Sequence, residues 1–163
     1  MNDKGFSLIE LIIVVVIIGI IAAIAVPNFL AARRSASQAS AVSSIRLISS
    51  AQETYQITTG TGNFGSLVQL RNDRLIDDVL ATGAKSGYTY SITTFNSTST
   101  NPSVFNAYAN AAIFGTSPVS TGSRNYYVNE SGTIYENSAG QDNPPDATSN
   151  TDRTIVNGTP LAR

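Results

Sequence analysis

The sequence predicts an α+β protein in which one long N-terminal α-helix, with a membrane-spanning half and an amphipathic half, packs on a small antiparallel β-sheet. Two observations carry this prediction. The apolar residues of the 163-residue chain are concentrated near its start, where 22 consecutive uncharged residues run from Leu11 to Ala32. Beyond residue 84, short stretches instead alternate between apolar and polar residues and are separated by turn-forming Gly, Asn and Ser, which is typical of paired strands.

The composition excludes several classes of function. The formal net charge is −1 and only 13% of the residues are charged, so we expect no specific nucleic-acid partner, which would need clustered basic residues. The sequence contains neither Cys nor His. This excludes disulfides, thiolate metal sites and thiol catalysis, and it removes the most common general base.

The apolar run is long enough to span a membrane over about residues 8–30. Fifteen of the 16 residues from Leu11 to Val26 are apolar, and at about 1.5 Å per residue the run covers the roughly 30 Å hydrocarbon core of a bilayer. A buried helix of a soluble protein rarely needs so many apolar residues. A cleavable secretory signal is the other alternative, because Ala22-Ala23-Ile24-Ala25 imitates its cleavage site, but a retained membrane helix fits the length better.

Glu10 is the charged residue at the start of this helix. A carboxylate at the centre of a spanning helix costs about 2.5–3.5 kcal/mol, and less near the end of the helix. The residues alone leave two interpretations open. Either Glu10 interacts with the helix dipole from the first turn, or it is held for a specific positive partner.

The motif around Glu10 resembles that of a known family. Lys4-Gly5-Phe6-Ser7-Leu8-Ile9-Glu10, followed by the apolar run with Pro27 and Phe29, is similar to the N-terminus of type IV prepilins and their pseudopilin relatives. The resemblance is strong over residues 1–55 and covers only the general layout beyond them. It implies the pilin fold, a structural role without catalysis or cofactor, and assembly with other copies of the same chain into a helical fibre.

The resemblance also implies processing and further partners. Residues 1–5 would be a leader peptide, removed between Gly5 and Phe6 by a membrane aspartyl prepilin peptidase, with N-methylation of the new Phe6 amine. Before assembly the subunit would cross the bacterial inner membrane once, with its leader in the cytoplasm, in contact with the lipid bilayer and the inner-membrane pilus assembly machinery. After assembly it would lie in an extracellular pilus at the cell surface.

Assembly is expected to depend on Glu10 and Phe6. In a fibre the carboxylate of one subunit would meet the Phe6 amine of its neighbour, and two unit charges about 4 Å apart attract by about 4 kcal/mol at an effective dielectric near 20. Because both charges lose their hydration when they pair, the pair adds little to the affinity between subunits. Its expected effect is to favour the one alignment of neighbouring helices in which the two charges meet. Gly19 weakens the helix, and Pro27 removes a backbone donor, so we expect a kink or local melting at Pro27.

The second half of the long helix, which we place at residues 6–58 in total, is predicted to be amphipathic and to pack on its own subunit. The stripe consists of Ala41, Val42, Ile45, Ile48, Gln52 and Tyr55. Gly60 is expected to end the helix as a left-handed cap. Residues 60–65 match the dinucleotide fingerprint G-x-G-x-x-G, but they follow a helix instead of a strand, which favours a flexible helix-exit loop.

The remainder of the chain divides into three parts. Residues 59–83 are predicted to form this loop and short helical turns over the sheet, with Ser66 and Asp77 as caps. Residues 84–136 are predicted to form three or four antiparallel strands, with a hairpin turn at residues 129–132, Asn-Glu-Ser-Gly. Residues 137–163 form a polar C-terminal tail, in which residues 154–156 are expected to pair at a sheet edge.

The tail contains weak candidates for a metal site, although we expect no metal. Asp142, Asp146 and Asp152 would supply oxygen ligands for Ca²⁺, as in some pseudopilins, but their spacing matches no EF-hand loop, so a solvated tail is favoured. Sequons at three asparagines are candidate glycan acceptors. They are Asn96, Asn129 and Asn157.

Two features depart from the family pattern. Many type IV pilins close a C-terminal loop with a disulfide, which a chain without Cys cannot form, so the hairpin, hydrophobic packing and fibre neighbours are expected to hold the end. Counting Lys4 against Arg33 and Arg34 would also place the two arginines in the cytoplasm. The resemblance implies the opposite orientation, which we adopt because the cleavage motif is more specific than a count of three charges.

The expected function is therefore that of a structural subunit, the major pilin, of a type IV pilus. A pseudopilin of a type II secretion system is the first alternative. A signal-anchored extracytoplasmic binding or enzymatic domain is the alternative from another class.

Overall fold

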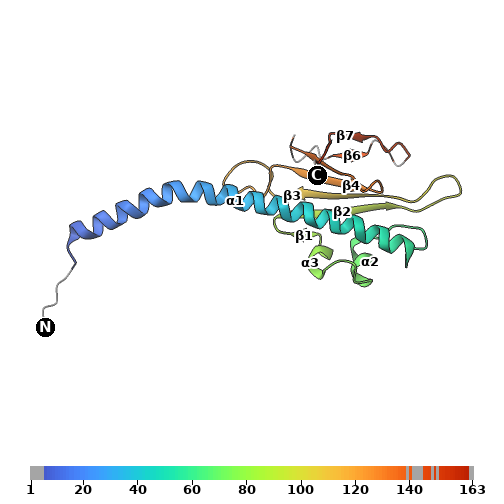
Figure 1. The fold of residues 1–163 in the computed structure, drawn as a ribbon, viewed down its shortest axis with the longest axis horizontal. Coiled ribbons are helices and arrows are strands. Elements are labelled where there is room, and N and C mark those ends of the chain that lie inside the picture. Colours follow the sequence, from blue (N-terminus) through green and yellow to red (C-terminus); the bar gives the residue numbers. More distant parts are fainter. Residues whose placement is uncertain (1–5, 139, 141–144, 148, 150, 162–163) are drawn as a thin grey trace.

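The computed structural model describes residues 6–138, 140, 145–147, 149 and 151–161. One very long helix, α1 (Leu8–Ile57), carries an α+β head on its second half, while its first half projects away (Figure 1). We use "head" for residues 58–161 and "apolar arm" for residues 8–29 of α1. A long N-terminal helix packed on a small antiparallel sheet confirms the predicted fold class.

Helix α1 is continuous over its 50 residues, a length of about 75 Å. Gly19 and Pro27 lie inside it without interrupting it, and its first half curves gently (Figure 1). The helix therefore does not melt at Pro27 in the single subunit. The kink predicted at Pro27 stays a prediction.

Gly60 does not adopt the left-handed conformation that the sequence predicts, because the positive φ angles near the end of α1 belong to Thr61 (47°) and Gly62 (92°). Gly60 is needed for close packing instead. A Cβ atom at Gly60 would lie 2.1 Å from the carbonyl oxygen of Asn63 and 2.8 Å from the ring of Tyr55. The loop after α1 is thus pressed against the last turns of the helix.

This loop is held by buried hydrogen bonds, so the prediction of a flexible helix exit does not describe it. Gln52 is fully buried. Its Nε2 donates to the carbonyl of Gly65 at 2.6 Å, and its Oε1 accepts from the Gly65 N–H at 2.8 Å. Two short helices follow, α2 (Leu67–Asn72) and α3 (Asp78–Ala81), and both predicted caps, Ser66 and Asp77, accept from backbone N–H groups.

The main sheet is antiparallel and has six strands in the order β1-β2-β3-β4-β5-β8. The strands are β1 (Ala84–Lys85), β2 (Tyr88–Phe95), β3 (Val104–Ala111), β4 (Asn125–Asn129), β5 (Ile134–Asn137) and β8 (Thr159–Pro160). The expected three or four strands are too few because β1 and β8 have two residues each, which is too short for an alternating pattern. The predicted hairpin turn is confirmed: Gly132 has φ 69°, and its N–H donates to the Asn129 carbonyl at 3.0 Å.

The sequence predicts that residues 154–156 pair at a sheet edge, and two of them do form a paired strand, but in a separate small sheet. Residues Ile155–Val156 form β7, which pairs with β6 (Asp146–Ala147) in a separate two-stranded sheet. The edge of the main sheet is taken by β8, which pairs with Tyr135 and Glu136 of β5. Only residues 157 and 158 therefore lie between the predicted strand and β8, the strand that reaches the edge of the main sheet.

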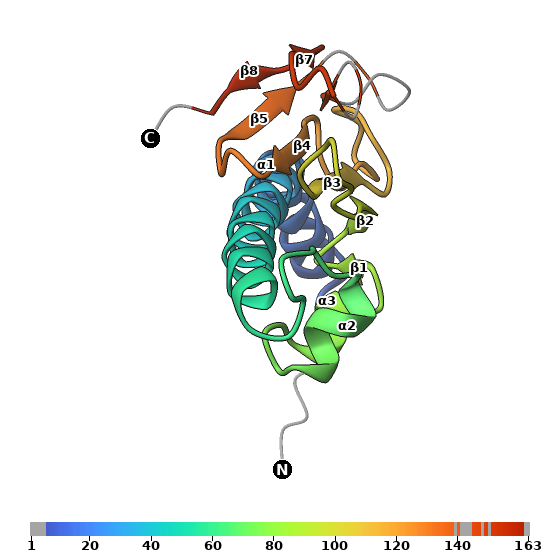
Figure 2. The same ribbon diagram turned by 90° about the vertical axis from the view of Figure 1, so that its right-hand side faces the viewer.

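The core lies between the second half of α1 and one face of the sheet (Figure 2). Ala41, Ile45 and Ile48 are fully buried and face β3 and β4, where small side chains at Ala107 and Ala109 let the helix approach closely. Burial of a side chain the size of isoleucine contributes about 2 kcal/mol. The predicted amphipathic stripe is confirmed, and it fixes the head to α1 at a defined distance from the arm.

Candidate functional site

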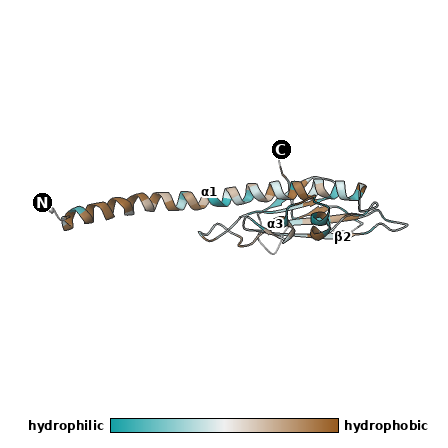
Figure 3. Cartoon of the chain, turned by 90° about the horizontal axis from the view of Figure 1, so that it is seen from below, coloured by the Kyte–Doolittle hydropathy of each residue, from teal (hydrophilic) through white to brown (hydrophobic). Residues whose placement is uncertain are grey.

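The apolar arm is the most unusual surface of the molecule. Every residue from Leu8 to Phe29 is exposed, with large apolar side chains 46–77% accessible, and the arm stands out as a continuous apolar rod in Figure 3. The mean hydropathy of its most apolar 18 residues is 3.2, and among the described residues α1 is the one helix long and apolar enough to cross a membrane. A surface of this extent is far larger than the apolar patches of monomeric soluble proteins, so lipid or other protein must cover it.

The charged end of the arm places Glu10 in the first turn of α1. Phe6, two residues before the helix, is 84% exposed, and the Leu11 N–H donates to the Ser7 carbonyl at 3.2 Å to begin the helix. Glu10 forms no ion pair within the part of the chain that the structure describes. Gly5 lies outside the described residues. One helical turn thus separates Phe6 from a carboxylate surrounded by apolar side chains.

Gly19 and Pro27 lie in the same arm, away from the head. A Cβ atom at Gly19 would have no heavy atom within 4 Å, so packing inside the single subunit does not require a glycine there. Pro27 is likewise exposed. The structure therefore places Glu10, Gly19 and Pro27 on the exposed first half of α1.

The three candidate metal ligands are not assembled into a site in the described part of the chain. Asp142 lies outside the described residues. Asp146 accepts the hydroxyl proton of Tyr108 at 2.7 Å, whereas Asp152 accepts from the backbone and hydroxyl of Thr154 at 3.0 and 2.7 Å. The Thr154 hydrogen bonds hold the pKa of the Asp152 carboxyl below its usual value. No group of three His, Cys, Asp or Glu side chains suited to a metal ion occurs among the described residues.

The three sequon asparagines differ in accessibility. Asn96 and Asn157 are exposed. Asn129 is only 3% exposed, and its Oδ1 accepts from the backbone and hydroxyl of Ser131 in the hairpin turn. Asn129 is therefore a poor acceptor for a glycan in the folded subunit.

Arg153 is a residue that the sequence analysis did not single out, and it ties the tail to the sheet. Its guanidinium binds Glu130 with both nitrogens of one edge, Nε to Oε1 at 2.6 Å and Nη2 to Oε2 at 2.8 Å. Nη2 also donates to the Phe105 carbonyl at 2.9 Å and to Asn106 Oδ1 at 2.7 Å. We call these four groups the Arg153 clasp. A lone arginine in a polar tail carries no sequence signal for such a role.

Buried tyrosines surround the clasp. Tyr127 is fully buried, its hydroxyl donates to Asn106 at 2.9 Å, and burial raises its pKa to about 12. Burial, reinforced by the hydrogen bond to Asp146, also raises the pKa of Tyr108, whose ring centroid lies 5.3 Å from that of Tyr127. These phenols remain neutral at physiological pH and pack as structural groups.

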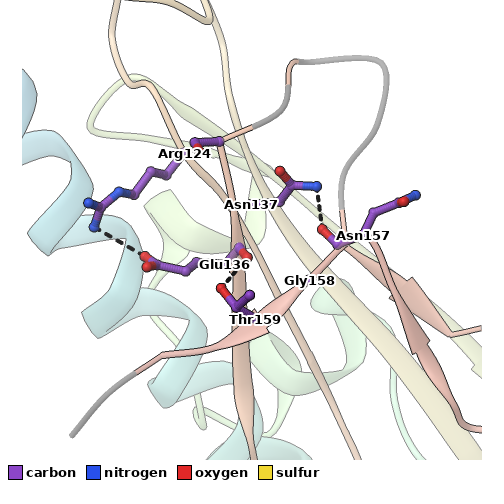
Figure 4. Close-up of a pocket in the computed structure, with 7 residues that line it drawn as sticks. Arg124, Glu136, Asn137, Asn157, Gly158 and Thr159 are labelled. Carbon is purple, nitrogen blue, oxygen red and sulfur yellow. Dashed lines mark hydrogen bonds and ion pairs between the residues drawn. The ribbon is translucent and has the colours of Figure 1, made fainter.

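A shallow cavity of about 400 Å³ lies beside the pairing of β5 with β8 (Figure 4). Its lining residues bind one another. Arg124 Nη1 pairs with Glu136 Oε2 at 3.2 Å, the Asn137 amide donates to the Asn157 carbonyl, and the Thr159 hydroxyl donates to the Glu136 carbonyl at 3.4 Å. These contacts indicate that the lining residues hold neighbouring segments of the head together, and they do not favour a catalytic site.

Comparisons with known proteins match the chain to type IV pilus components and to a type II secretion system protein. The family model of the prokaryotic N-terminal methylation motif matches residues 1–26. The chain is 44% identical over 71 residues to the type IV wide pilus major component PilA4 of Thermus thermophilus, which covers 42% of this chain and 54% of the relative. It is 41% identical over 93 residues to the type IV narrow pilus major component PilA5 of the same organism, covering 55% of this chain and 71% of the relative.

A third relative has another role. The chain is 37% identical over 56 residues to the type II secretion system core protein G of Escherichia coli, covering 34% of this chain and 39% of the relative. The chain thus spans about half the length of the wide-pilus component and less of the secretion protein. No solved structure gives a significant match.

Proposed function

Because this chain belongs to the type IV pilin family, we propose that it is the structural subunit of a type IV pilus, and its major pilin, polymerising through the apolar arm. The observation that carries the proposal is the complete exposure of residues 8–29. The core of the subunit is formed by the head and the second half of α1, so the arm is free to pack against lipid or against other arms. A protein that acted alone would have no use for such a surface.

The arm fits two environments in turn. Before assembly, about 33 Å of apolar helix spans the hydrocarbon core of the inner membrane, with the leader in the cytoplasm and the head on the outer side. In the fibre, arms of neighbouring subunits replace the lipid, and close van der Waals packing holds them together. Gly19, which no group of its own subunit crowds, offers a point of close approach. The assembled fibre lies at the cell surface.

Processing prepares the N-terminus for assembly. A prepilin peptidase cuts between Gly5 and Phe6, the new Phe6 amine is methylated, and the membrane assembly machinery extracts the subunit. The cationic amine then pairs with Glu10 of a neighbouring subunit. Without that pairing Glu10 is a carboxylate among exposed apolar side chains, which is unfavourable in a dry fibre core.

A structural role without catalysis agrees with the polar groups of the head. The carboxylates of Glu130 and Glu136 are paired with arginines, and the buried tyrosines are neutral. The named relatives are pilus components or a secretion-system core protein. These observations support a protein that acts by assembling.

Replacing Glu10 by glutamine tests the proposal, with Glu53→Gln as the matched control. Both changes remove one exposed carboxylate from α1, but only Glu10 lies in the arm. We expect Glu10→Gln protein to enter the membrane normally, because a charge has left the bilayer, and to be absent or scarce in fibres sheared from the cells. Glu53→Gln should leave the fibres intact.

Immunoblots of the membrane and sheared fractions, with electron microscopy, give the result. Normal fibres from Glu10→Gln cells would remove the charge-pairing argument. Absence of the unaltered protein from any fibre would remove the pilus function itself.

A second candidate function, a pseudopilin of a type II secretion system, is favoured by the similarity to core protein G. The resemblance implies that some pseudopilins bind Ca²⁺. Calcium dependence of the head is therefore the property that distinguishes a pseudopilin from a pilus subunit. Asp146 and Asp152 are already engaged with Tyr108 and Thr154, which supports the pilus.

A further inference from the structure

The β3–β4 loop contacts α1 at the point where the apolar arm ends. Leu30 is the first residue of α1 that the head partly covers. The Arg34 guanidinium donates from Nη1 to the Ser117 carbonyl at 3.2 Å, and the loop reaches α1 at the end of the head that faces the arm (Figure 1). The turn at residues 117–120 is therefore a part of the head that lies beside the arm.

This turn is rigid but presents an apolar tip. The Ser120 N–H donates to the Ser117 carbonyl at 3.0 Å, and the hydroxyls of the same two serines lie 2.8 Å apart. Thr121 anchors the turn through its N–H, which donates to the Ile113 carbonyl at 2.9 Å. Val119 at the tip is nevertheless 71% exposed. A pre-organised turn with an exposed apolar tip is suited to contact with a surface outside the subunit.

Positive charge accompanies this tip. A groove of about 480 Å³ separates α1 from the turn, and its charged lining residues are Arg33 and Arg34, with no carboxylate among the residues that line it. Arg33 is exposed and forms no ion pair with any residue that the structure describes. Guanidinium groups bind phosphate oxygens in pairs, which makes this groove suited to a phosphate-bearing surface.

The height of this groove coincides with the edge of a bilayer. The 22 residues of the apolar arm, residues 8–29, rise by about 33 Å, and the hydrocarbon core is roughly 30 Å thick. If the arm spans the membrane, then Arg33, Arg34 and the turn lie at the level of the lipid headgroups. We call Leu30, Arg33, Arg34 and residues 117–120 the basic collar.

We propose that the basic collar docks on the phospholipid headgroups of the outer leaflet before assembly, with Arg33 and Arg34 on lipid phosphates and Val119 in the interface. The inference rests on the proposed membrane-spanning state of the arm. It explains why two arginines are tolerated on the translocated side of the membrane, where counting of charges disfavours them. Docking also holds the head in one orientation relative to the bilayer.

The test uses the full chain in nanodiscs, at one subunit per disc, with a single environment-sensitive fluorophore. The chain contains no Cys, so Val119→Cys, Ile18→Cys and Val68→Cys each provide one labelling site. Val68 is the matched control, because it is 58% exposed but lies on α2 of the head. Spin-labelled lipids, with the quencher at the headgroup or deep in the acyl chain, report the depth of each probe.

We expect the probe at residue 18 to be quenched from the acyl chains, the probe at residue 119 from the headgroups, and the probe at residue 68 by neither. Phosphatidylglycerol should strengthen quenching at residue 119 relative to phosphatidylcholine alone. Arg33→Gln should lower the ratio of docked to undocked heads by about fivefold, since an arginine near an anionic surface contributes about that factor. Arg46→Gln, an exposed arginine of α1 farther along the helix, should not.

Two results would overturn the inference. A deep probe at residue 18 with a water-exposed probe at residue 119 would contradict docking and leave the membrane-spanning arm intact. Quenching at residue 119 that appears only when several subunits share a disc would assign the collar to contacts between copies. A probe at residue 18 that no acyl-chain label quenches would instead contradict the proposed function.

Discussion

Arg153 closes the C-terminal tail on the sheet without a covalent bond. Its side chain is 19% exposed and that of Glu130 is 27% exposed, so both charges are largely withdrawn from water and depend on each other. The same guanidinium satisfies a backbone carbonyl of β3. In a chain without Cys, this clasp is a non-covalent link between the tail and the sheet.

Replacing Arg153 by alanine should therefore destabilise the head by about 2 kcal/mol, since it strands the Glu130 carboxylate and two acceptors. Arg153→Lys should recover only part of this loss, because an ammonium group cannot reproduce the two-nitrogen contact. Arg124→Ala is the control: the Arg124 side chain is 49% exposed in its pair with Glu136, and such pairs contribute less than about 1 kcal/mol. Urea unfolding of the detergent-solubilised chain measures the free energy of unfolding of all three variants. If Arg153→Ala and Arg124→Ala lost the same amount of stability, the proposed role of the Arg153 clasp would be wrong.

The buried tyrosines give the head a sensitivity to alkaline pH. Burial raises the pKa of Tyr127 to about 12 and also raises the pKa of Tyr88 and Tyr108, whereas an unfolded tyrosine ionises near pH 10. A folded-state pKa above the unfolded value contributes stability that is complete below about pH 10 and is lost as the pH rises toward the folded values. The free energy of unfolding should therefore fall from pH 10 to pH 12. In a spectroscopic titration of the folded protein, the phenolate absorbance should appear at a higher pH than it does for unfolded tyrosine. Constant stability across this range would show that these hydroxyls are solvated.

At the scale of elements, the parts governed by local pattern were predictable and the parts governed by distant partners were not. The apolar run and the stripe from Ala41 to Tyr55 predict α1 because both repeat at helical spacing, and Ser66 and Asp77 cap helices through residues three positions away. Strand β8 has two residues and exists only because it pairs with β5, more than 20 residues earlier in the chain. Gly60 likewise serves a contact with Tyr55 that its own dihedral preference does not reveal.

The residues of the candidate site also fall into a group that the sequence predicts and a group that it does not. Glu10, Gly19 and Pro27 are identified by a motif within one helix. The Arg153 clasp joins β3, the β4–β5 turn and the tail, so its geometry follows from the tertiary fold and no spacing in the sequence announces it.

The response of the C-terminal tail to calcium distinguishes the two candidate functions, pilus subunit and pseudopilin. Because the Asp146 and Asp152 carboxylates are engaged separately, we expect little effect of calcium on a soluble fragment that starts near Asn28 and contains the head with the second half of α1. Its melting temperature should change by less than about 2 °C between excess EDTA and millimolar Ca²⁺. Stabilisation of even 1 kcal/mol would shift a domain of this size by about 4 °C or more. A calcium-dependent rise of about ten degrees that Asp146→Ala abolishes would favour the pseudopilin.

At the scale of the whole molecule, the structure joins two parts with opposite solvent requirements. The head shares one core with the second half of α1, to which Ile45, Ile48 and the Gln52–Gly65 hydrogen bonds hold it. The arm buries nothing within the subunit and requires lipid or neighbouring arms. The basic collar lies at the boundary between the two. This division of surfaces fits the proposed function, which places the subunit first in a membrane and then in a fibre.

The mass and N-terminal sequence of the protein in fibres sheared from the native cells show whether this chain is a processed pilus subunit. We expect a subunit that begins at Phe6, carries one methyl group on its terminal amine and retains the whole apolar arm. A protein that begins at Met1 or near Ala25, or one that is missing from the sheared fibres, would contradict it.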